Sequence, residues 1–384
     1  MSKISACAAP RPDVLELVET TEPSLSALYP APTTICLLQA GRTLARVTVS
    51  PAEQEGLRGR SPQQLRNTAL LHGLEIDDLE LIGPLLYLAL RRARIWGRTT
   101  IAATPPAAGL LGKHLALEPV DGDGELHAQR IDLAIHRAYA ASDASGQQLC
   151  REHMLPEALA IFARHCRRFH HTAWARAVRG RRLARAQYVA TLANTHQYVR
   201  FTPRLLARAV AVSEDEALRE HFLEHLGGER RHHELIEADL RYLGADVEFV
   251  RERMSPAPAT MQFMLVQESM VAFYRDPVLF MAAPFVAEGL AASVGPELMG
   301  PLLDNIRAWG HDEPQKATRF LRSHVHLDGG DDGHFARTCA VIAGYLRDEA
   351  VHQRFLAVMQ LAAEAFHRSY DAYVDDLSVF SPPA

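Results

Sequence analysis

Residues 222–244 read FLEHLGGERRHHELIEADLRYLG and combine histidine and acidic side chains with leucines at helical spacing. Glu229 and His232 are three positions apart, so a helix places both on one face. His225 precedes His232 by one heptad and can share that face. Pairs of the Glu-x-x-His kind hold two metal ions in some helical bundles, and the alternative is a solvated helix face. Gly244 suits the position that follows a helix C-terminus.

A second ligand-type residue lies downstream in the sequence FVAEGLA, where Glu288 is surrounded by apolar side chains. Such a helix is expected to be buried on several faces. A buried carboxylate is costly unless it is paired or bound to a metal ion. We therefore expect Glu288 to bind metal, with a salt bridge to an arginine as the alternative.

A third group follows in residues 324–334, HVHLDGGDDGH. His324 and Asp328 are four positions apart and share a helix face, which directs His326 elsewhere. His334 follows across a glycine-rich break. The alternative is an acidic surface loop that happens to contain histidines.

These groups supply three carboxylates and three imidazoles from at least three helices. Mixed histidine and carboxylate ligation suits iron or manganese and oxygen chemistry, and there are enough donors for two ions. The predicted metal ligands are Glu229, His232, Glu288, His324, Asp328 and His334.

Composition bounds the remaining possibilities. The 384 residues, 48% hydrophobic and 23% charged, suit one or two globular domains with a sizeable core. A net charge of −5 gives no overall attraction to nucleic acid or anionic membranes. Five scattered cysteines without a C-x-x-C pair argue against disulfides and structural zinc. No signal peptide or membrane-spanning run is recognised, so we expect a cytoplasmic protein.

The sequence predicts two domains. Residues 1–125 predict a small mixed α/β domain of unknown role, and residues 126–384 predict an all-α bundle that carries the metal site. The local predictions are a hairpin at 33–49, helices at 62–73, 77–94, 126–142, 156–179 and 183–200, a strand at 99–103, and a capping box formed by Ser213 and Glu216.

With these motifs assembled, residues 140–375 resemble the heme-oxygenase-like di-iron oxidases, also known as iron-containing redox enzymes. The matching sequences are GGERRHHELIEADLRYLG, FVAEGLA and FLRSHVHLD followed by a histidine; His232, Glu288 and His324 are separated by 56 and 36 residues. The resemblance implies a helical bundle related to heme oxygenase but without haem. It also implies Glu288 as a bridging ligand. The family often has a histidine three residues after the aspartate, where this chain has Asp331, so either His334 or Asp331 completes the set.

The resemblance further implies two Fe²⁺ ions, O₂ as co-substrate and a small-molecule substrate. The expected activity is an oxidase or oxygenase acting on an amine, amino acid or fatty-acid-like compound, by N-oxygenation or oxidative C–C cleavage, in a biosynthetic pathway. An external electron donor and a homodimer are compatible with it. His225 or Glu224 can replace or supplement Glu229 as a ligand. The candidates for lining a substrate pocket, or else plain core, are Met264, Phe273, Phe280 and Phe285.

Two alternatives belong to other classes. One is a non-catalytic helical protein that binds metal or a partner. The other is a metal-free, thiaminase-like hydrolase on the same bundle, which needs an activated cysteine; Cys166 and Cys339 have no evident base beside them in the sequence. A haem-binding reading would use His196 as an axial ligand, but it leaves Glu288 and Asp328 unexplained.

Overall fold

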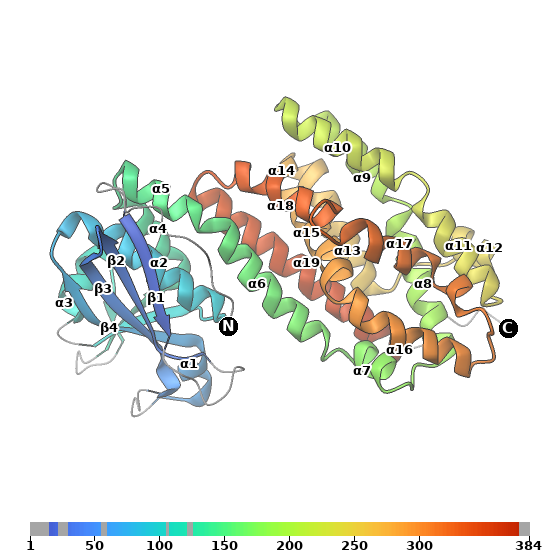
Figure 1. The fold of residues 1–384 in the computed structure, drawn as a ribbon, viewed down its shortest axis with the longest axis horizontal. Coiled ribbons are helices and arrows are strands. Elements are labelled where there is room, and N and C mark those ends of the chain that lie inside the picture. The colour runs from blue at the N-terminus through green and yellow to red at the C-terminus, as the bar shows by residue number, and fades with distance from the viewer. Residues whose placement is uncertain (1–14, 22–29, 55–59, 105–106, 121–125, 376–384) are drawn as a thin grey trace. The chain divides into compact units, whose positions relative to one another are not determined.

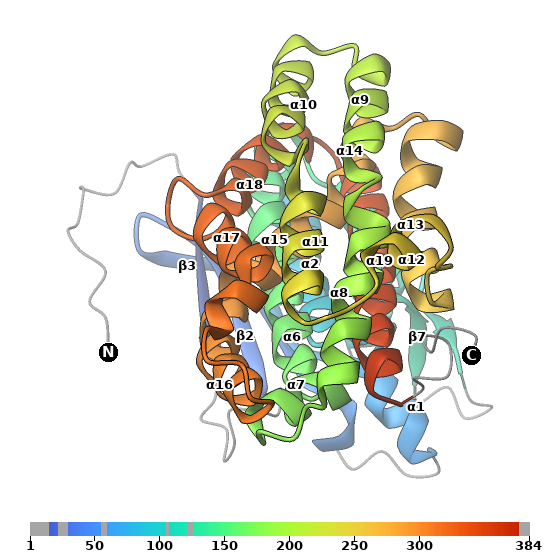
Figure 2. The same ribbon diagram turned by 90° about the vertical axis from the view of Figure 1, so that its right-hand side faces the viewer.

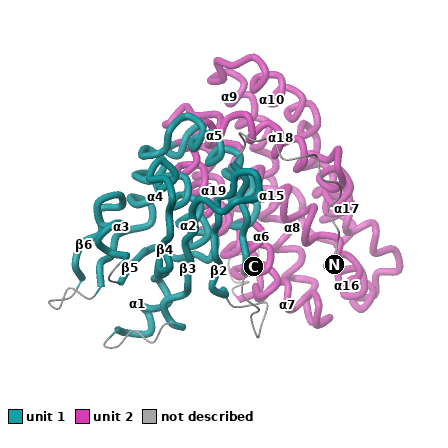
Figure 3. The backbone as a smooth tube through the Cα atoms, turned by 60° about the vertical axis from the view of Figure 1, so that its left-hand side comes forward, with its two compact units in different colours: residues 1–161, 348–350 teal, residues 162–347, 351–384 magenta. Residues whose placement is uncertain are grey.

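Two compact units make up the computed structural model, which describes residues 15–21, 30–54, 60–104, 107–120 and 126–375. The first unit comprises residues 1–161 and 348–350, and the second comprises residues 162–347 and 351–384 (Figure 3). The domain boundary predicted between residues 125 and 126 stays a prediction.

A seven-stranded sheet forms the first unit (Figure 1). Its strand order is β1-β2-β3-β4-β5-β7-β6, and every neighbouring pair is antiparallel except the parallel pair β4 and β5. The strands are β1 Leu15–Thr21, β2 Thr33–Gln39, β3 Arg42–Pro51, β4 Thr68–Ile76, β5 Thr100–Ala103, β6 Glu118–Pro119 and β7 His127–Arg130.

The predicted hairpin is present as β2 and β3. Ala40 and Gly41, between these strands, both have positive φ angles, of 50° and 78°, as a two-residue hairpin turn requires. The helix predicted at 62–73 is wrong after Asn67. The capping box at Ser61 starts helix α1, Pro62–Asn67, but the next residues pair with β3 and β5 as strand β4, whose Ala69, Leu70 and Leu71 are buried.

Helix α2, Ile82–Ile95, is the buried centre of this unit. It packs on β2 and β3 and against α4, Ile131–Ala140, and α5, Ala144–Glu152. The prediction at 77–94 is confirmed by α2, and the strand at 99–103 by β5. The helix predicted at 126–142 is shorter, because β7 takes its first residues into the sheet. The remaining elements are η1 Ala52–Gln54, η2 Leu79–Leu81, α2 Ile82–Ile95, α3 Ala107–Leu115, α4 Ile131–Ala140, α5 Ala144–Glu152 and the start of α6 Met154–Phe169.

The second unit is helical throughout its described residues. Helix α11 contacts α8 on one side and α17 on another (Figure 2). Its elements after α6 are α7 Ala173–Arg179, α8 Arg185–Val199, α9 Thr202–Val212, α10 Glu216–Glu229, α11 His232–Tyr242, α12 Val247–Glu252, α13 Pro258–Glu268, η3 Ser269–Phe273, α14 Pro277–Phe280, α15 Ala282–Ser293, α16 Gly295–Ala308, η4 Pro314–Ala317, α17 Arg319–Asp328, α18 His334–Tyr345 and α19 Glu349–Asp375.

Three predictions concern the ends of helices in this unit, and two of them are wrong. The helix predicted at 156–179 is two helices, because Thr172 caps α7 by accepting a hydrogen bond from the Ala175 amide. The capping box at Ser213 is wrong: Asp215 caps α10, and the Ser213 hydroxyl donates back to the Ala209 carbonyl. Gly244 follows α11 with a φ of 71°, as predicted.

The predicted fold class, mainly α with a helical bundle and a small mixed α/β N-terminal part, is confirmed. No single helix among the described residues is long and apolar enough to cross a membrane, although the bent pair Pro277–Ser293 and Gly295–Ala308 passes that test jointly by length and composition.

Candidate metal centre

Five helices bring the predicted ligand residues together inside the second unit. His225 and Glu229 lie on α10 and His232 begins α11. The other helices contribute Glu288 from α15, His324 and Asp328 from α17, and His334 from the start of α18. All six predicted residues therefore lie in one cluster, and His225 joins them.

The two ligand residues that were expected on one helix lie on two consecutive helices. Helix α10 ends at Glu229, and α11 starts at His232. The short turn nevertheless brings their side chains together, with His232 Nδ1 3.0 Å from Glu229 Oε2. His324 approaches the same pair from α17, and its ring centroid lies 4.8 Å from that of His232. Donor atoms of these three residues all lie within 4.8 Å of one another.

A second group of donors shares Glu229. One donor atom each from His225, Glu229 and His334 also lie within 4.8 Å of one another. Glu288 joins this group, because its Oε1 lies 3.0 Å from His225 Nε2. Its other oxygen accepts a hydrogen bond from the Thr338 hydroxyl at 3.0 Å. The two groups are therefore adjacent, and Glu229 is the carboxylate between them.

Asp328 lies beside two imidazoles rather than in either group of three. Its Oδ2 is 3.0 Å from His324 Nδ1, and its Oδ1 is 3.2 Å from His334 Nδ1. A carboxylate that holds one ring nitrogen fixes the tautomer and turns the other nitrogen toward a metal. His324 Nε2 is buried and has no hydrogen-bond partner among the described residues. This geometry suits Asp328 as an orienting residue as well as a ligand.

The electrostatics of the cluster favour bound positive charge. Burial alone would lower the pKa of His225, yet the carboxylate of Glu288 raises it to about 9. Burial opposes ionisation of Glu229, but His232 and His324 bring its pKa below the usual value. Burial likewise opposes ionisation of Asp328, and His324 and His334 lower its pKa. In the metal-free protein the protonated imidazole of His225 supplies positive charge to these carboxylates, and a bound metal ion would take its place.

These residues fit a pair of transition-metal ions. Each group offers two imidazole nitrogens and a carboxylate oxygen, a donor set typical of non-haem iron and manganese sites. The shared carboxylate suits two neighbouring ions. The chemistry of the donor set and the unpartnered His324 Nε2 both support this fit.

An apolar cavity of about 150 Å³ reaches the cluster. His225, Glu229, Glu288 and His324 line it at one place, and its other lining side chains are mostly apolar. The large ones include Phe169, Trp174, Phe263, Leu298, Phe320 and Phe366.

The pocket residues expected from the sequence do not line this cavity. Met264, Phe273, Phe280 and Phe285 are absent from its walls. Phe280 and Phe285 are core residues, at 1% and 0% exposure, whereas Phe273 is 79% exposed. The cavity uses Phe263, the neighbour of Met264 on α13, and Met264 itself is half-buried outside its walls.

The structure distinguishes between the alternative ligand residues that the sequence left open. His334, and not Asp331, faces the cluster, since Asp331 is exposed. His225 supplements Glu229, while Glu224 is exposed. His326 is exposed, as predicted. Thr338 was missed, because a threonine on a helix carries no signal of its own in the sequence.

Comparisons with known proteins identify no family. No family model matches the chain, and no curated protein matches it. The solved structures that are similar to this chain include two heme oxygenase-like or TenA-related proteins. One is a domain of unknown function with a heme oxygenase-like fold from Shewanella denitrificans, at 16% identity and a TM-score of 0.47, covering 62% of this chain and 94% of that one. The other is a TenA homolog from Pseudomonas syringae pv. tomato, at 11% identity and a TM-score of 0.49, covering 62% and 96%. At these identities and scores the likeness assigns no activity or ligand to this chain.

Proposed function

We propose that this protein is an O₂-dependent non-haem di-iron oxidase or oxygenase acting on a small molecule. The observation that carries the proposal is the shared position of Glu229 between two groups of histidines, one with His232 and His324 and one with His225 and His334. Two iron ions bound there would supply O₂ binding and electrons for oxidation of a substrate.

The side chains of this chain would have separate tasks. The four histidines and Glu229 would hold the ions, with Glu288 beside the second group. Asp328 would hold Nδ1 of His324 through a hydrogen bond and lie beside Nδ1 of His334. Thr338 would orient Glu288 through its hydroxyl. The apolar wall would exclude water from the reacting part of the substrate.

The cavity favours one of the expected substrate classes. Apart from the residues of the cluster, no charged side chain is among its described lining residues. A free amino acid would bring two charges into this wall without partners, which is unfavourable. A compound with an aliphatic body and one polar head toward the metal centre fits better. We therefore favour a fatty-acid-like substrate over an amine or amino acid.

Anaerobic Fe²⁺ titration tests the metal centre. We expect about two iron ions per chain in the wild type, at most one in His324→Ala and Glu288→Ala, and O₂ uptake by the reduced, iron-loaded wild type. His326→Ala is the matched control, since His326 lies on the same helix but is exposed. Absence of iron uptake, or an equal loss in the His326→Ala control, would contradict the proposal. Iron uptake without O₂ consumption would favour the non-catalytic alternative.

A change in the cavity wall separates substrate binding from metal binding. Ala291 lines the cavity on α15, three residues after Glu288. Ala291→Phe should fill the cavity, leave iron content unchanged and abolish the binding of a fluorescent fatty-acid analogue. Unchanged binding of the analogue would contradict the assignment of the cavity.

The thiaminase-like alternative is compatible with a helical bundle but finds no activated cysteine among the described residues. Burial raises the pKa of Cys150 and Cys339 to about 12 and that of Cys166 to about 11, which disfavours the thiolate. The haem reading is also disfavoured, since Glu237 lies 3.2 Å from His196 Nε2. Thiamine cleavage by metal-free protein would revive the hydrolase.

A further inference from the structure

The face of α11 that turns away from the metal centre carries a second, unrelated polar site. His232 on α11 meets His324 of α17, whereas Glu237, further along α11, meets His196 of α8. Around Glu237 lies a pocket of about 730 Å³ between α8, α9, α11 and α12. Its lining residues are His196, Arg200, Phe201, Arg204, His233, Glu234, Glu237, Arg241 and Arg251.

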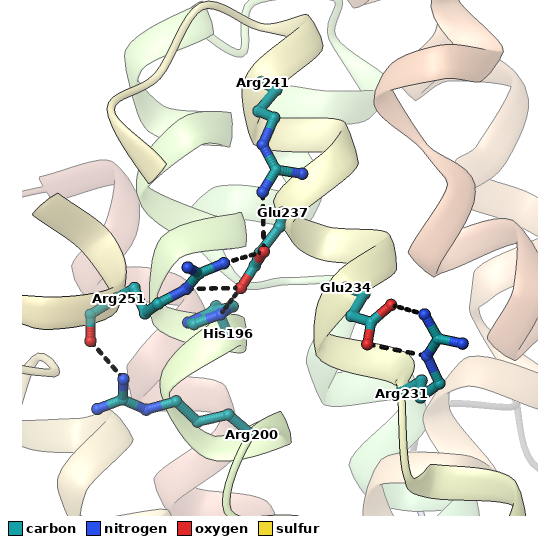
Figure 4. A network of polar contacts seen from close by, with 7 residues as sticks. All are labelled: His196, Arg200, Arg231, Glu234, Glu237, Arg241 and Arg251. Carbon is teal, nitrogen blue, oxygen red and sulfur yellow. Dashed lines mark hydrogen bonds and ion pairs between the residues drawn. The ribbon is translucent and has the colours of Figure 1, made fainter. Parts of the chain in front are cut away.

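The carboxylates of this pocket already have cationic partners (Figure 4). Glu237, only 4% exposed, accepts hydrogen bonds from Arg251 at 3.1 and 2.5 Å and from Arg241 at 3.0 Å. Glu234 is held in the same way by Arg231, at 2.9 and 2.6 Å. Neither carboxylate is left to neutralise the other arginines of the pocket.

Two guanidinium groups remain without a carboxylate hydrogen bond among the described residues. Arg200 and Arg204 both lie against the ring of Phe201, with their Cζ atoms 5.0 and 5.3 Å from its centroid. Arg200 donates one hydrogen bond, to the Arg251 carbonyl at 2.5 Å, and its Nε is buried without a partner. His233 Nδ1 in the same pocket is also buried and unpartnered.

Holding two guanidinium groups together is unfavourable unless an anion joins them. Burial lowers the pKa of Arg200; the charge of Glu252 raises it, and the neighbouring Arg204 lowers it by a smaller amount. Five arginines and four carboxylates surround the pocket, the carboxylates being those of Glu234, Glu237, Glu248 and Glu252. Glu234 and Glu237 are held by other arginines, so Arg204 has no carboxylate hydrogen bond among the described residues and Arg200 has only the nearby charge of Glu252.

We propose that this pocket binds the phosphate group of a small phosphate monoester, with Arg200 and Arg204 as its principal donors. A phosphate dianion matches two guanidinium groups in charge, and its three terminal oxygens suit their forked donors. The ring of Phe201 fixes both side chains in advance, which reduces the entropy lost on binding. This inference does not depend on the proposed oxidase activity.

Isothermal titration calorimetry of the metal-free protein with inorganic phosphate and with glycerol phosphate tests this site. We expect saturable binding at one site per chain, weakened about tenfold or more in Arg204→Gln and Arg200→Gln. Arg208→Gln is the matched control, because Arg208 lies on α9 but pairs with Glu268 outside the pocket. Binding should persist in Arg208→Gln and also in His324→Ala, which separates this site from the metal centre.

Three results would overturn the proposal: no saturable binding of either probe, equal weakening in Arg208→Gln, or loss of binding in His324→Ala. Tighter binding of citrate than of glycerol phosphate would overturn the assignment to phosphate. Arg200 also donates a hydrogen bond to the backbone of α12, so circular dichroism should check that the Arg200→Gln variant is folded. If Arg200→Gln is unfolded, the binding measured for Arg204→Gln decides whether the proposal holds.

Discussion

His232 Nδ1 lies 3.0 Å from Glu229 Oε2, although Glu229 ends one helix and His232 begins the next. The break allows α10 and α11 to run in their own directions while both ligand residues reach His324 on α17. It also leaves His225, one turn before Glu229 on α10, free to meet Glu288 and His334. One carboxylate is thereby shared by two pairs of histidines.

Gly289, directly after Glu288, has no room for a side chain. A Cβ atom there would lie 2.5 Å from Phe162 Cζ and 2.7 Å from Phe335 Cε2. These rings cannot easily move, because Phe162 packs on Phe285 at 5.3 Å and on Phe335 at 5.5 Å between centroids. Gly289→Ala should therefore destabilise the protein by about 1–2 kcal/mol, since overpacking outweighs the helix propensity gained.

Urea unfolding of the metal-free protein measures this effect. The control is Gly227→Ala on α10, where no atom lies within 4 Å of the added Cβ. That change should stabilise by about 0.5–1 kcal/mol from propensity alone. A stabilised Gly289→Ala variant would show that the aromatic packing around α15 is looser than described.

His165 and His367 form a buried pair that makes stability depend on pH. They are 7% and 1% exposed, with ring centroids 5.7 Å apart. Burial lowers the pKa of each histidine to about 4. The charge of Arg168 lowers both pKa values further, and the charge of His367 also lowers that of His165. The carboxylate of Glu364 raises both pKa values and offsets part of this effect. In the unfolded chain their pKa returns to about 6.5, so between these values the unfolded state binds more protons.

The contribution of this pair to stability should accordingly be present above about pH 6.5 and be lost as the pH is lowered toward 4, by roughly 2 kcal/mol per histidine at pH 5. His367→Phe should make this decline shallower, because one proton-binding group is gone. The exposed His171 provides the control His171→Phe, which should leave the slope unchanged. Urea unfolding at pH 5 and 7.5 measures both, and equal slopes in all three proteins would contradict the prediction.

Arg94 holds two fully buried carboxylates in the first unit. It donates to Glu157 at 2.5 and 2.8 Å and to Glu349 at 2.8 Å, and both glutamates are 0% exposed. The Tyr87 hydroxyl also donates to Glu349, at 2.8 Å. Arg94→Met should destabilise the protein by about 3–5 kcal/mol, because it removes the guanidinium that neutralises both buried carboxylates.

The matched rescue is Arg94→Met combined with Glu157→Gln and Glu349→Gln, which removes the unpaired charges and should recover part of the loss. Urea unfolding compares the three proteins. A single variant as stable as the wild type would show that the carboxylates reach solvent or protonate at little cost.

The sequence predicts the cluster better than it predicts the helices that build it. His324 and Asp328 are four apart on one helix, as their spacing indicates. Glu229 and His232 were expected on one helix that Gly227 and Gly228 could loosen or kink just before Glu229. Both glycines lie inside α10, and the break comes after them, at residues 230–231. Local turn geometry, and not helix periodicity, brings this pair together.

Long-range contacts account for what the sequence could not predict. Residues 68–73 follow a well-formed helix start, yet pairing with β3 and β5 makes them a strand. His225 was recognised as an alternative ligand, but only its contact with Glu288, on a different helix, includes it in the cluster. The cavity wall is equally non-local, since Phe169, Phe263 and Phe366 come from three separate helices.

Anomalous diffraction at the iron edge, from crystals of anaerobically loaded protein, tests whether Glu229 lies between two iron ions. We expect two iron peaks on either side of the Glu229 carboxylate, one near His232 and His324 and the other near His225 and His334. A single peak away from Glu229, or no peak at full iron loading in solution, would contradict it.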